Sequence, residues 1–327
     1  MAHPLVSVVT PFYDSAAYLE ECIDSVLAQT LGDFEYVLVD NRSKDNSKEI
    51  AERYAKRDPR IRVFQNDQFV GQVDNYNGAV TRIASGSKYV KIVQADDAIF
   101  PDCLRAMVEV AERDPRIGIV SSFYLKGDDP TGTGVPRDAW RVNGREMVRK
   151  MLVGNCYPLG SPTTVLYRAD LVRARTPFYA LGRYHEDTEA AYEILLEHDL
   201  GFVHQILSFL RTNNVSIMSA ARRFDPTALD HLVLLERFGP EVLSPEELEQ
   251  QSTAEWRAYR GFLGANVLAR RGEDFWNYHR RGLEMIGRPL RTRDLVVPTL
   301  KQFARLMLNP LDAVETRLPE LGKRRGR

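Results

Sequence analysis

The chain has 327 residues, of which 44% are hydrophobic and 27% charged, so it is globular, with one large domain or a domain and an appendage. The formal net charge of -1 excludes an overall basic field that would attract nucleic acid. Three scattered cysteines are too few for a disulfide framework or a zinc site and favour a reducing compartment such as the cytoplasm. No apolar run has the length of a membrane span, and the N-terminus shows no signal peptide.

The first 120 residues alternate short apolar, β-branched runs with amphipathic helical patterns. We predict strands at residues 5–10, 36–39, 61–64, 89–93 and 117–120, with a helix between each pair. Pro11 is expected to end the first strand, and Asp14 or Ser15 to cap the helix that follows. This alternation predicts a parallel sheet with right-handed crossovers.

Polar residues follow three of these strands. Thr10 and Pro11 end the first strand, Asp40 ends the second, and Asp96 and Asp97 follow the fourth. Carboxyl ends of parallel strands share one edge of a sheet, so we expect these residues around one crevice. Adjacent carboxylates repel unless a cation or hydrogen-bond donors hold them, and hard oxygen ligands suit Mg²⁺ or Mn²⁺ carrying a diphosphate. On position alone, a turn with a helix cap explains the same residues.

The second half is less regular. Residues 127–137 read as a loop, residues 143–153 as a short helix, and residues 163–167 and 201–210 as strands. A helix at residues 184–198 opens with His185, Glu186 and Asp187. Carboxylates are favoured at a helix N-terminus for structural reasons, and the helix dipole is expected to lower the pKa of Asp187. From residue 226 onward the apolar spacing is helical.

The nucleotide-binding and nucleophile fingerprints are missing from the sequence. It contains no GxGxxG, no GxxxxGK[ST] and no GxSxG. The carboxylates therefore remain as the candidates for chemistry.

Four segments together resemble the family 2 glycosyltransferases of the GT-A fold. They are VSVVTPFYDSAAYLEECIDSVLAQT, VLVDNRSKDNS, NGAVTRIASGSKYVKIVQADDAIFP and HEDTEAAYEIL. The resemblance covers about the first 220 residues. It implies a Rossmann-like α/β fold with a mostly parallel central sheet flanked by helices. We expect a GT-A domain at 1–225, with a nucleotide-binding half at about 1–120 and an acceptor-binding half at about 121–225, and a helical C-terminal region at 226–327.

The resemblance also implies roles for individual residues. Asp187 maps to the catalytic base, with Glu186 as its competitor, and Asp97 maps to a ligand of Mn²⁺ or Mg²⁺. The nucleotide-sugar would be held by Thr10, Pro11, Phe12, Tyr13, Asp40, Asn77, Gln94 and Asp96. The acceptor side would hold Gly160, Ser161 and His185.

The sequence departs from the family pattern at four places. Gln94 stands for the usual Asp two residues before the acidic pair, and Asn41 for a second Asp after strand two. Tyr76 stands where many members have Arg. Asn213 and Asn214 stand in a loop where many members have His.

The resemblance implies an inverting transferase of the hexosyl or N-acetylhexosaminyl type, with a UDP-sugar as the most common donor. The acceptor would be a carbohydrate or a lipid-linked carbohydrate of bacterial polysaccharide or glycoconjugate synthesis. QxxRW and membrane helices are missing, which favours transfer of one sugar over processive synthesis. The basic C-terminal tail leaves a peripheral membrane contact open. Alternatives are a sugar nucleotidyltransferase and a degenerate GT-A domain that binds carbohydrate or protein without turnover.

Overall fold

The computed structural model describes residues 3–154, 156–182, 185–212 and 224–308. The chain forms two compact units, Met1–Val215 and Ser216–Arg327. The division falls in residues 213–223, outside the described part, so the predicted boundary after residue 225 stays a prediction. Asn213, Asn214 and the basic tail at residues 322–327 also lie outside the described residues.

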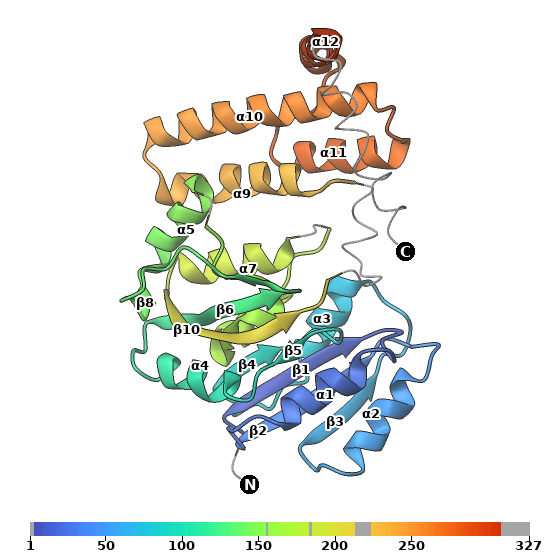
Figure 1. Ribbon diagram of the computed structural model, residues 1–327, viewed down its shortest axis with the longest axis vertical. Coiled ribbons are helices and arrows are strands. Elements are labelled where there is room, and N and C mark those ends of the chain that lie inside the picture. Colours follow the sequence, from blue (N-terminus) through green and yellow to red (C-terminus); the bar gives the residue numbers. More distant parts are fainter. Residues whose placement is uncertain (1–2, 155, 183–184, 213–223, 309–327) are drawn as a thin grey trace. The chain divides into compact units, whose positions relative to one another are not determined.

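The first unit contains a mixed sheet with helices packed on it (Figure 1). In its described part, ten strands follow the order β3-β2-β1-β4-β9-β6-β10-β5, with β7 beside β6 and β8 beside β10. The strands are β1 (Val6–Phe12), β2 (Phe34–Asp40), β3 (Ile61–Gln65), β4 (Tyr89–Ile92), β5 (Ala98–Ile99), β6 (Ile117–Lys126), β7 (Asp129–Thr131), β8 (Arg141–Val142), β9 (Leu166–Arg168) and β10 (Asp199–Leu210). The helices are α1 (Leu19–Leu27), α2 (Ser47–Ala55), α3 (Gln72–Val80), α4 (Cys103–Ala111), α5 (Gly144–Val153), the 3₁₀ turn η1 (Pro162–Thr164), α6 (Ala169–Arg173) and α7 (Glu186–Leu195).

The predicted parallel core is present. β1 pairs in parallel with β2 and β4, and β2 pairs in parallel with β3. β9 lies between β4 and β6 and runs antiparallel to both. The chain enters β9 from η1. Thr163 of η1 donates a hydrogen bond to Asp97, which lies just past the end of β4. β9 therefore begins at that edge of the sheet and runs in the direction opposite to β4. The expected α/β class is confirmed, with a sheet that is mixed rather than purely parallel.

Two predicted ends of β1 and α1 are wrong. β1 continues through Pro11 to Phe12. Its pairing with β4 stops at Val9, so the missing N–H of Pro11 removes no hydrogen bond between β1 and β4. α1 begins at Leu19, and neither Asp14 nor Ser15 caps it. Asp14 instead accepts a hydrogen bond from the Lys44 amide, 2.6 Å away, and so joins two loops at the carboxyl edge.

Two predicted elements of the second half also differ. Residues 127–137 include β7, which forms a hairpin with β6. Gly127 makes the tight turn possible, since its φ of +59° is unfavourable for other residues. The predicted strand at residues 163–167 divides into η1 and β9 because Pro162 and the Ser161 cap start a turn of helix there.

One large hydrophobic core packs against β1 and β2, the strands that end in Phe12 and Asp40. Alternate residues of β1 and β2, such as Val8 and Leu38, share a cluster with the apolar faces of α1, α2 and α4. Ile23 and Leu104 are fully buried in it. Burial of about 1.5–3 kcal/mol per large apolar side chain fixes the strand ends in place.

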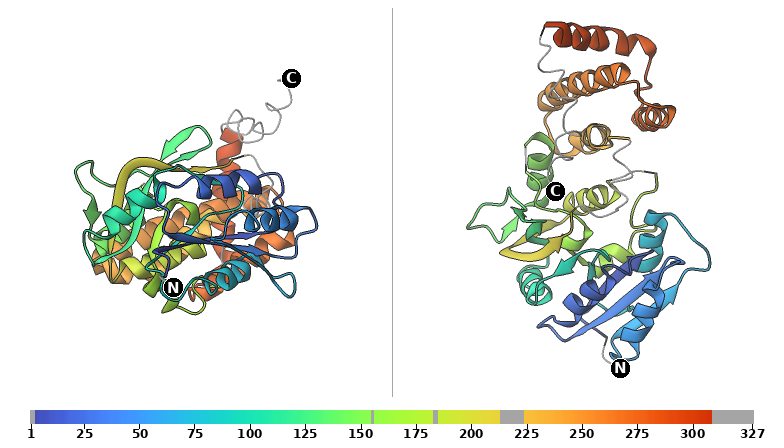
Figure 2. Two further views of the ribbon diagram at one scale, coloured as in Figure 1. Left: turned by 90° about the horizontal axis from the view of Figure 1, so that it is seen from below. Right: turned by 45° about the vertical axis from the view of Figure 1, so that its right-hand side comes forward.

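The second unit is helical, as the C-terminal pattern predicts. It contains α9 (Thr227–Val242), α10 (Pro245–Leu268), α11 (Glu273–Met285) and α12 (Thr292–Leu308). α10 packs against α9 and against α12, and these helices stack in the right-hand view of Figure 2. Leu232, Tyr259, Leu263 and Phe275 are the centre of its own apolar core. None of the helices within the described ranges has the length and apolar character needed to cross a membrane.

Candidate active site

The residues predicted to share a crevice do lie at one edge of the sheet. Asp40 pairs with Phe12 at the ends of β2 and β1. The Thr10 hydroxyl donates to the Val93 carbonyl, 2.8 Å away, and so joins β1 to the segment just after β4. The turn that follows is closed by the Asp97 amide, which donates to the Gln94 carbonyl at 3.0 Å. The carboxyl ends of three strands thus deliver these side chains to one region.

Asp97 is the most constrained of the carboxylates. It is 5% exposed. Its Oδ2 accepts from the Thr163 hydroxyl at 2.6 Å, and its Oδ1 accepts from the Arg211 amide at 3.1 Å. Burial, and after it the charge of Asp96, raises the pKa of Asp97 to about 7. The two neutral donors hold the carboxyl without cancelling the cost of burying its charge.

Arg211 brings a cation to the acidic pair. It follows directly after β10, and its Nε donates to the Asp96 carbonyl at 3.0 Å. The same guanidinium pairs with Glu21 on α1 and lies over the Tyr18 ring. The sequence reasoning did not single out Arg211 or Thr163. A lone Arg at the end of a strand and a Thr after Pro carry no pattern that marks them as neighbours of Asp97.

Asp40 is fully buried at the end of β2, on the same edge of the sheet. Its Oδ1 accepts from the Ser43 amide at 2.9 Å, and its Oδ2 accepts from the Gln65 amide nitrogen at 2.7 Å. Asn41 supports the next loop, because its Oδ1 accepts from the Val70 amide at 3.1 Å. Asn41, which replaces the Asp of the family pattern, therefore helps to hold this loop. Its side-chain amide both donates a hydrogen bond to the loop and accepts one from it.

An exposed aromatic pair stands beside these loops. Tyr13 is 37% exposed and Phe69 is 60% exposed, and their ring centroids are 4.9 Å apart. Tyr13 was predicted as a site residue, whereas Phe69 was missed. The sequence feature that could have marked Phe69 is the position of an aromatic residue within the polar loop QNDQFVG. Exposed flat rings at this edge of the sheet suit stacking against a base.

Thr10, Pro11 and Phe12 are buried and present little side chain to a ligand. The Thr10 hydroxyl is shared between the Val93 carbonyl and the Tyr36 hydroxyl, 3.0 Å away, and Phe12 is 2% exposed. These residues set the position of the strand end. Tyr13 is the member of the segment whose side chain reaches solvent.

Asn77 is engaged within the protein. Its amide nitrogen donates to the Tyr179 carbonyl at 2.9 Å, and its oxygen accepts from the Tyr179 amide at 2.8 Å. This paired contact ties the segment before α7 to α3. A direct contact with the nucleotide would have to break it, so the geometry favours a positioning role over the predicted binding role.

Two of the departures from the family pattern meet in space. The Tyr76 hydroxyl hydrogen-bonds the Gln94 side chain, and the backbone N–H of Gln94 donates to the Thr163 hydroxyl at 3.0 Å. Burial, and then the charges of Asp96, Asp97 and Glu186, raises the pKa of Tyr76, so this hydroxyl stays protonated. Two uncharged side chains, Tyr76 and Gln94, therefore lie near the carboxylates of Asp96, Asp97 and Glu186.

Gly160 and Ser161 support Thr163. Gly160 has a φ of +67°, and a Cβ there would lie 2.6 Å from the Thr164 hydroxyl, so a larger residue does not fit. The Ser161 hydroxyl accepts from the Thr163 amide at 3.3 Å and caps η1. Both predicted acceptor-side residues therefore lie in the turn that places the Asp97 donor.

Asp187 lies at the start of α7, as predicted, but its electrostatics are different. Burial raises its pKa, while His185, which precedes the helix, acts in the opposite direction. The expected lowering by the helix N-terminus is therefore wrong, because desolvation outweighs the dipole and the hydrogen bond from the Thr188 amide at 2.7 Å. A raised pKa makes Asp187 a stronger base than an exposed aspartate.

The charge of Asp187 acts on three tyrosines. Burial raises the pKa values of three tyrosines, and the charge of Asp187 raises them further; they are Tyr157, Tyr167 and Tyr179. The Tyr157 hydroxyl bonds the Thr188 hydroxyl, so Thr188 links this ring to the Asp187 carboxylate. Neither Tyr157 nor Thr188 is among the individual site residues predicted from the sequence.

The acidic pair fits a cation that arrives with its ligand. The described residues contain no group of three or more His, Cys, Asp or Glu side chains placed to hold a metal ion. Mg²⁺ commonly binds through one or two carboxylates and the phosphates of a substrate. Asp96 and Asp97 supply that many carboxylates, and one hydrogen bond to each Asp97 oxygen leaves a lone pair for a cation.

Comparison with known proteins shows which proteins this chain resembles. A curated protein of Bacillus subtilis (strain 168), described as uncharacterized glycosyltransferase EpsJ, is 39% identical over 133 residues, which cover 41% of this chain and 38% of that protein. The match thus spans about two fifths of the relative's length. The uncharacterized protein MT1568 of Mycobacterium tuberculosis is 27% identical over 274 residues and covers 78% of this chain and 82% of its own.

Two solved structures share the fold. Residues 1–349 of S. aureus TarS, in complex with UDP-GlcNAc, align with a TM-score of 0.63 at 20% identity and cover 92% of this chain and 87% of that chain. The mannosyltransferase PcManGT from Pyrobaculum calidifontis, in complex with GDP-Man and Mn²⁺, aligns with a TM-score of 0.55 at 17% identity and covers 93% of this chain and 88% of that chain.

The family model described as glycosyl transferase family 2 matches residues 7–175, which is more than half of the chain. That range contains β1, β2, β4 and the acidic turn after β4. The chain therefore belongs to glycosyltransferase family 2.

Proposed function

We propose that the protein is an inverting, metal-dependent glycosyltransferase that moves a sugar from a UDP-sugar to an acceptor hydroxyl. The observation that carries this proposal is that burial raises the pKa of two carboxylates, one in the turn after β4 and one at the start of α7. Asp97 is buried beside Asp96, and Asp187 has a raised pKa at the start of α7. The first suits a cation with a diphosphate, and the second suits a proton acceptor.

The nucleotide would occupy the half of the crevice formed by β1, β2 and β4. Tyr13 and Phe69 would offer rings to the base, and Asp40, which pairs with Phe12 at the strand ends, would accept a hydrogen bond from it. We assign Thr10 and Asn77 to positioning, since their polar atoms hold Val93 and Tyr179. The neighbours bound to UDP-GlcNAc and to GDP-Man support a nucleotide-sugar donor, and uridine is our choice between these bases.

The metal would be Mn²⁺ or Mg²⁺, held by Asp97 with the nearby Asp96. It would neutralise the charge that builds on the leaving diphosphate. The chain's own cation, Arg211, stands beside the same turn and would share in that neutralisation. The structure of PcManGT with Mn²⁺ supports a divalent cation in this family.

Asp187 would accept the proton of the attacking acceptor hydroxyl. A single displacement inverts the configuration of the anomeric centre. It needs one general base and no enzyme nucleophile. Glu186 and His185 flank it and would orient the acceptor. We propose a carbohydrate or lipid-linked carbohydrate acceptor of bacterial polysaccharide or glycoconjugate synthesis. Three free cysteines support a reducing compartment, the cytoplasm.

A thermal-shift panel of UDP, dTDP and GDP, each with and without Mn²⁺, tests the proposal. Ligand at 100 times its dissociation constant adds about 2.7 kcal/mol to the free energy of unfolding. We expect this shift with UDP and Mn²⁺ together and a much smaller one with either alone. Slow Mn²⁺-dependent hydrolysis of a UDP-sugar should accompany it. Binding without any turnover would instead indicate a degenerate binding domain, and synthesis of a nucleotide-sugar from UTP a nucleotidyltransferase.

The base site makes a separate prediction. Phe69→Ala removes an exposed ring and should weaken UDP binding at least about fivefold, because base stacking on an aromatic ring contributes about 1–3 kcal/mol. Trp140→Ala, a change of another exposed ring (37%) outside this site, is the matched control. Asp40→Ala should reduce the preference among nucleotide bases. Competition binding measures both, and an unchanged base preference in Asp40→Ala would contradict the assignment.

A further inference from the structure

The last described helix, α12, presents an apolar row to solvent. Val296, Leu300, Phe303 and Met307 are 51%, 61%, 52% and 69% exposed. Their spacing of four, three and four residues places them on one face of the helix. None of the described residues of α12 is buried. Single exposed apolar side chains are ordinary, but a continuous row of them marks an interaction surface.

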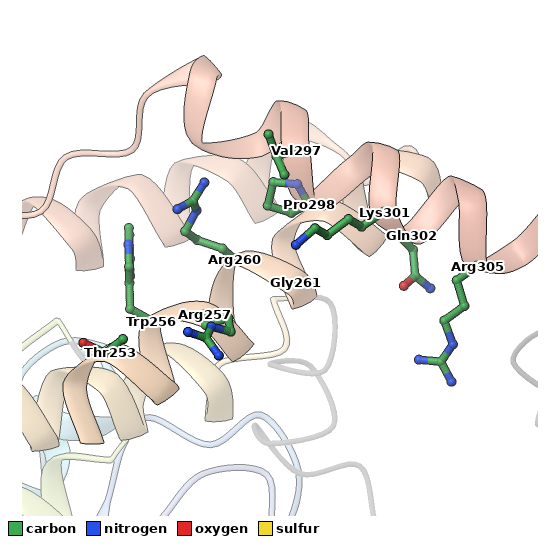
Figure 3. Close-up of a pocket in the computed structure, with 10 residues that line it drawn as sticks. All are labelled: Thr253, Trp256, Arg257, Arg260, Gly261, Val297, Pro298, Lys301, Gln302 and Arg305. Atoms are coloured by element: carbon green, nitrogen blue, oxygen red, sulfur yellow. The ribbon is translucent and has the colours of Figure 1, made fainter. Parts of the chain in front are cut away.

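A cationic groove lies on another side of the same helix. It runs between α10 and α12 and has a volume of about 500 Å³. Arg257 and Arg260 come from α10, and Lys301 and Arg305 come from α12 (Figure 3). Among the described residues, no carboxylate lines it. Trp256 gives it an aromatic wall.

The charge of the surrounding sequence has the same sign. Residues 288–327 contain ten Lys or Arg and four Asp or Glu. In the groove, Arg260 is oriented by a hydrogen bond from its Nε to the Asp294 carbonyl, 3.1 Å away. That bond uses a neutral acceptor, so the positive charge of the guanidinium remains available to an anion. An apolar row and a positive flank therefore occur together on one helix.

We propose that α12 docks the protein on an anionic lipid bilayer. The apolar row would enter the boundary between headgroups and acyl chains, with the helix lying in the membrane plane. Lys301, Arg305 and the α10 arginines would contact lipid phosphates. This surface is independent of the chemistry proposed for the sheet edge.

The two features together favour a bilayer over other occupants. A free phosphate would use the cations but not the apolar row. A second copy of the chain would bring an equally cationic face against this one, and like charges oppose that contact. An anionic bilayer matches both the apolar and the positive component.

Flotation of the full chain with phosphatidylcholine vesicles, with and without phosphatidylglycerol, tests the docking. We expect binding to the anionic vesicles only, weakened by salt. Phe303→Asp should reduce the partition coefficient about tenfold or more, since it removes a large apolar side chain from the lipid. Met285→Asp is the matched control: Met285 is also 52% exposed but lies on α11, and it should bind as the wild type does.

A second pair of variants tests the charge component. Lys301→Glu should weaken binding to anionic vesicles at least about fivefold, because each cation near such a surface contributes about 1 kcal/mol. Arg281→Glu, an exposed cation on α11, is its control. Thermal melting of all four variants establishes that each one folds.

Three outcomes would overturn the proposal. One is equal binding to neutral and anionic vesicles, or to neither. Another is a concentration-dependent dimer that Phe303→Asp dissociates in the absence of lipid, which would make the row a contact between copies. The third is vesicle binding that glycerol phosphate displaces and Phe303→Asp leaves intact, which would reduce the site to a phosphate groove.

Discussion

Asp187→Asn should lower turnover by about 10²–10⁴-fold, the usual range for loss of a general base. The change keeps the shape of the side chain and its place beside Thr188 but removes the proton acceptor. UDP binding should change little, because the nucleotide is assigned to the other half of the crevice. Steady-state kinetics and nucleotide binding, measured on the same preparations, separate the two effects.

Glu186→Gln is the matched control for this prediction. Adjacent residues of a helix point about 100° apart, so Asp187 and Glu186 cannot both face the acceptor. If Glu186→Gln loses turnover and Asp187→Asn does not, the two roles are exchanged. If neither variant is impaired, the proposed mechanism is wrong.

The pH dependence gives an independent check of the base. Burial raises the pKa of Asp187, so kcat/KM should fall with decreasing pH at a higher pH than an ordinary aspartate would give. His185 acts in the opposite direction, because its positive charge favours the ionised carboxylate. His185→Gln should therefore move the acidic limb of the profile to still higher pH. An acidic limb that does not move would show that His185 does not act on the titrating group.

Asp97→Ala should abolish the Mn²⁺ dependence of UDP binding. The carboxylate is the buried member of the acidic pair, and its removal would leave the proposed site with Asp96 alone. Asp102→Ala is the matched control, since Asp102 follows the same turn but has a side chain that is 47% exposed. Calorimetric titration of UDP at several Mn²⁺ concentrations measures the effect. Metal-dependent binding that persists in Asp97→Ala would refute the assignment.

The same residue predicts how stability depends on pH without metal. The pKa of Asp97 is about 7 in the folded protein against an ordinary value of 3.8. The folded state therefore holds a proton that the unfolded chain releases, and the free energy of unfolding should fall by about 4 kcal/mol as pH rises from about 4 to about 7. Asp97→Asn should remove this slope. UDP with Mn²⁺ should restore stability above pH 7, and their affinity should decrease below it as protons compete.

The sequence by itself determined the parallel core and the positions of the acidic residues along the chain. Strand and helix patterns alternate over the first 120 residues, and the carboxyl ends of parallel strands must share one edge. Asp40, Asp96 and Asp97 were therefore located without coordinates. The helical C-terminal region followed from apolar spacing in the same way.

Only the tertiary structure decided the partners and the electrostatics of those residues. Asp97 meets Thr163 and Arg211, which are 66 and 114 residues away along the chain. The pKa of Asp187 is raised rather than lowered, because burial in the folded chain penalises its charged form. Local patterns report which backbone conformation a segment prefers, whereas desolvation and hydrogen-bond partners depend on what distant segments place next to it. That is why the sequence located the carboxylates and the folded chain set their chemistry.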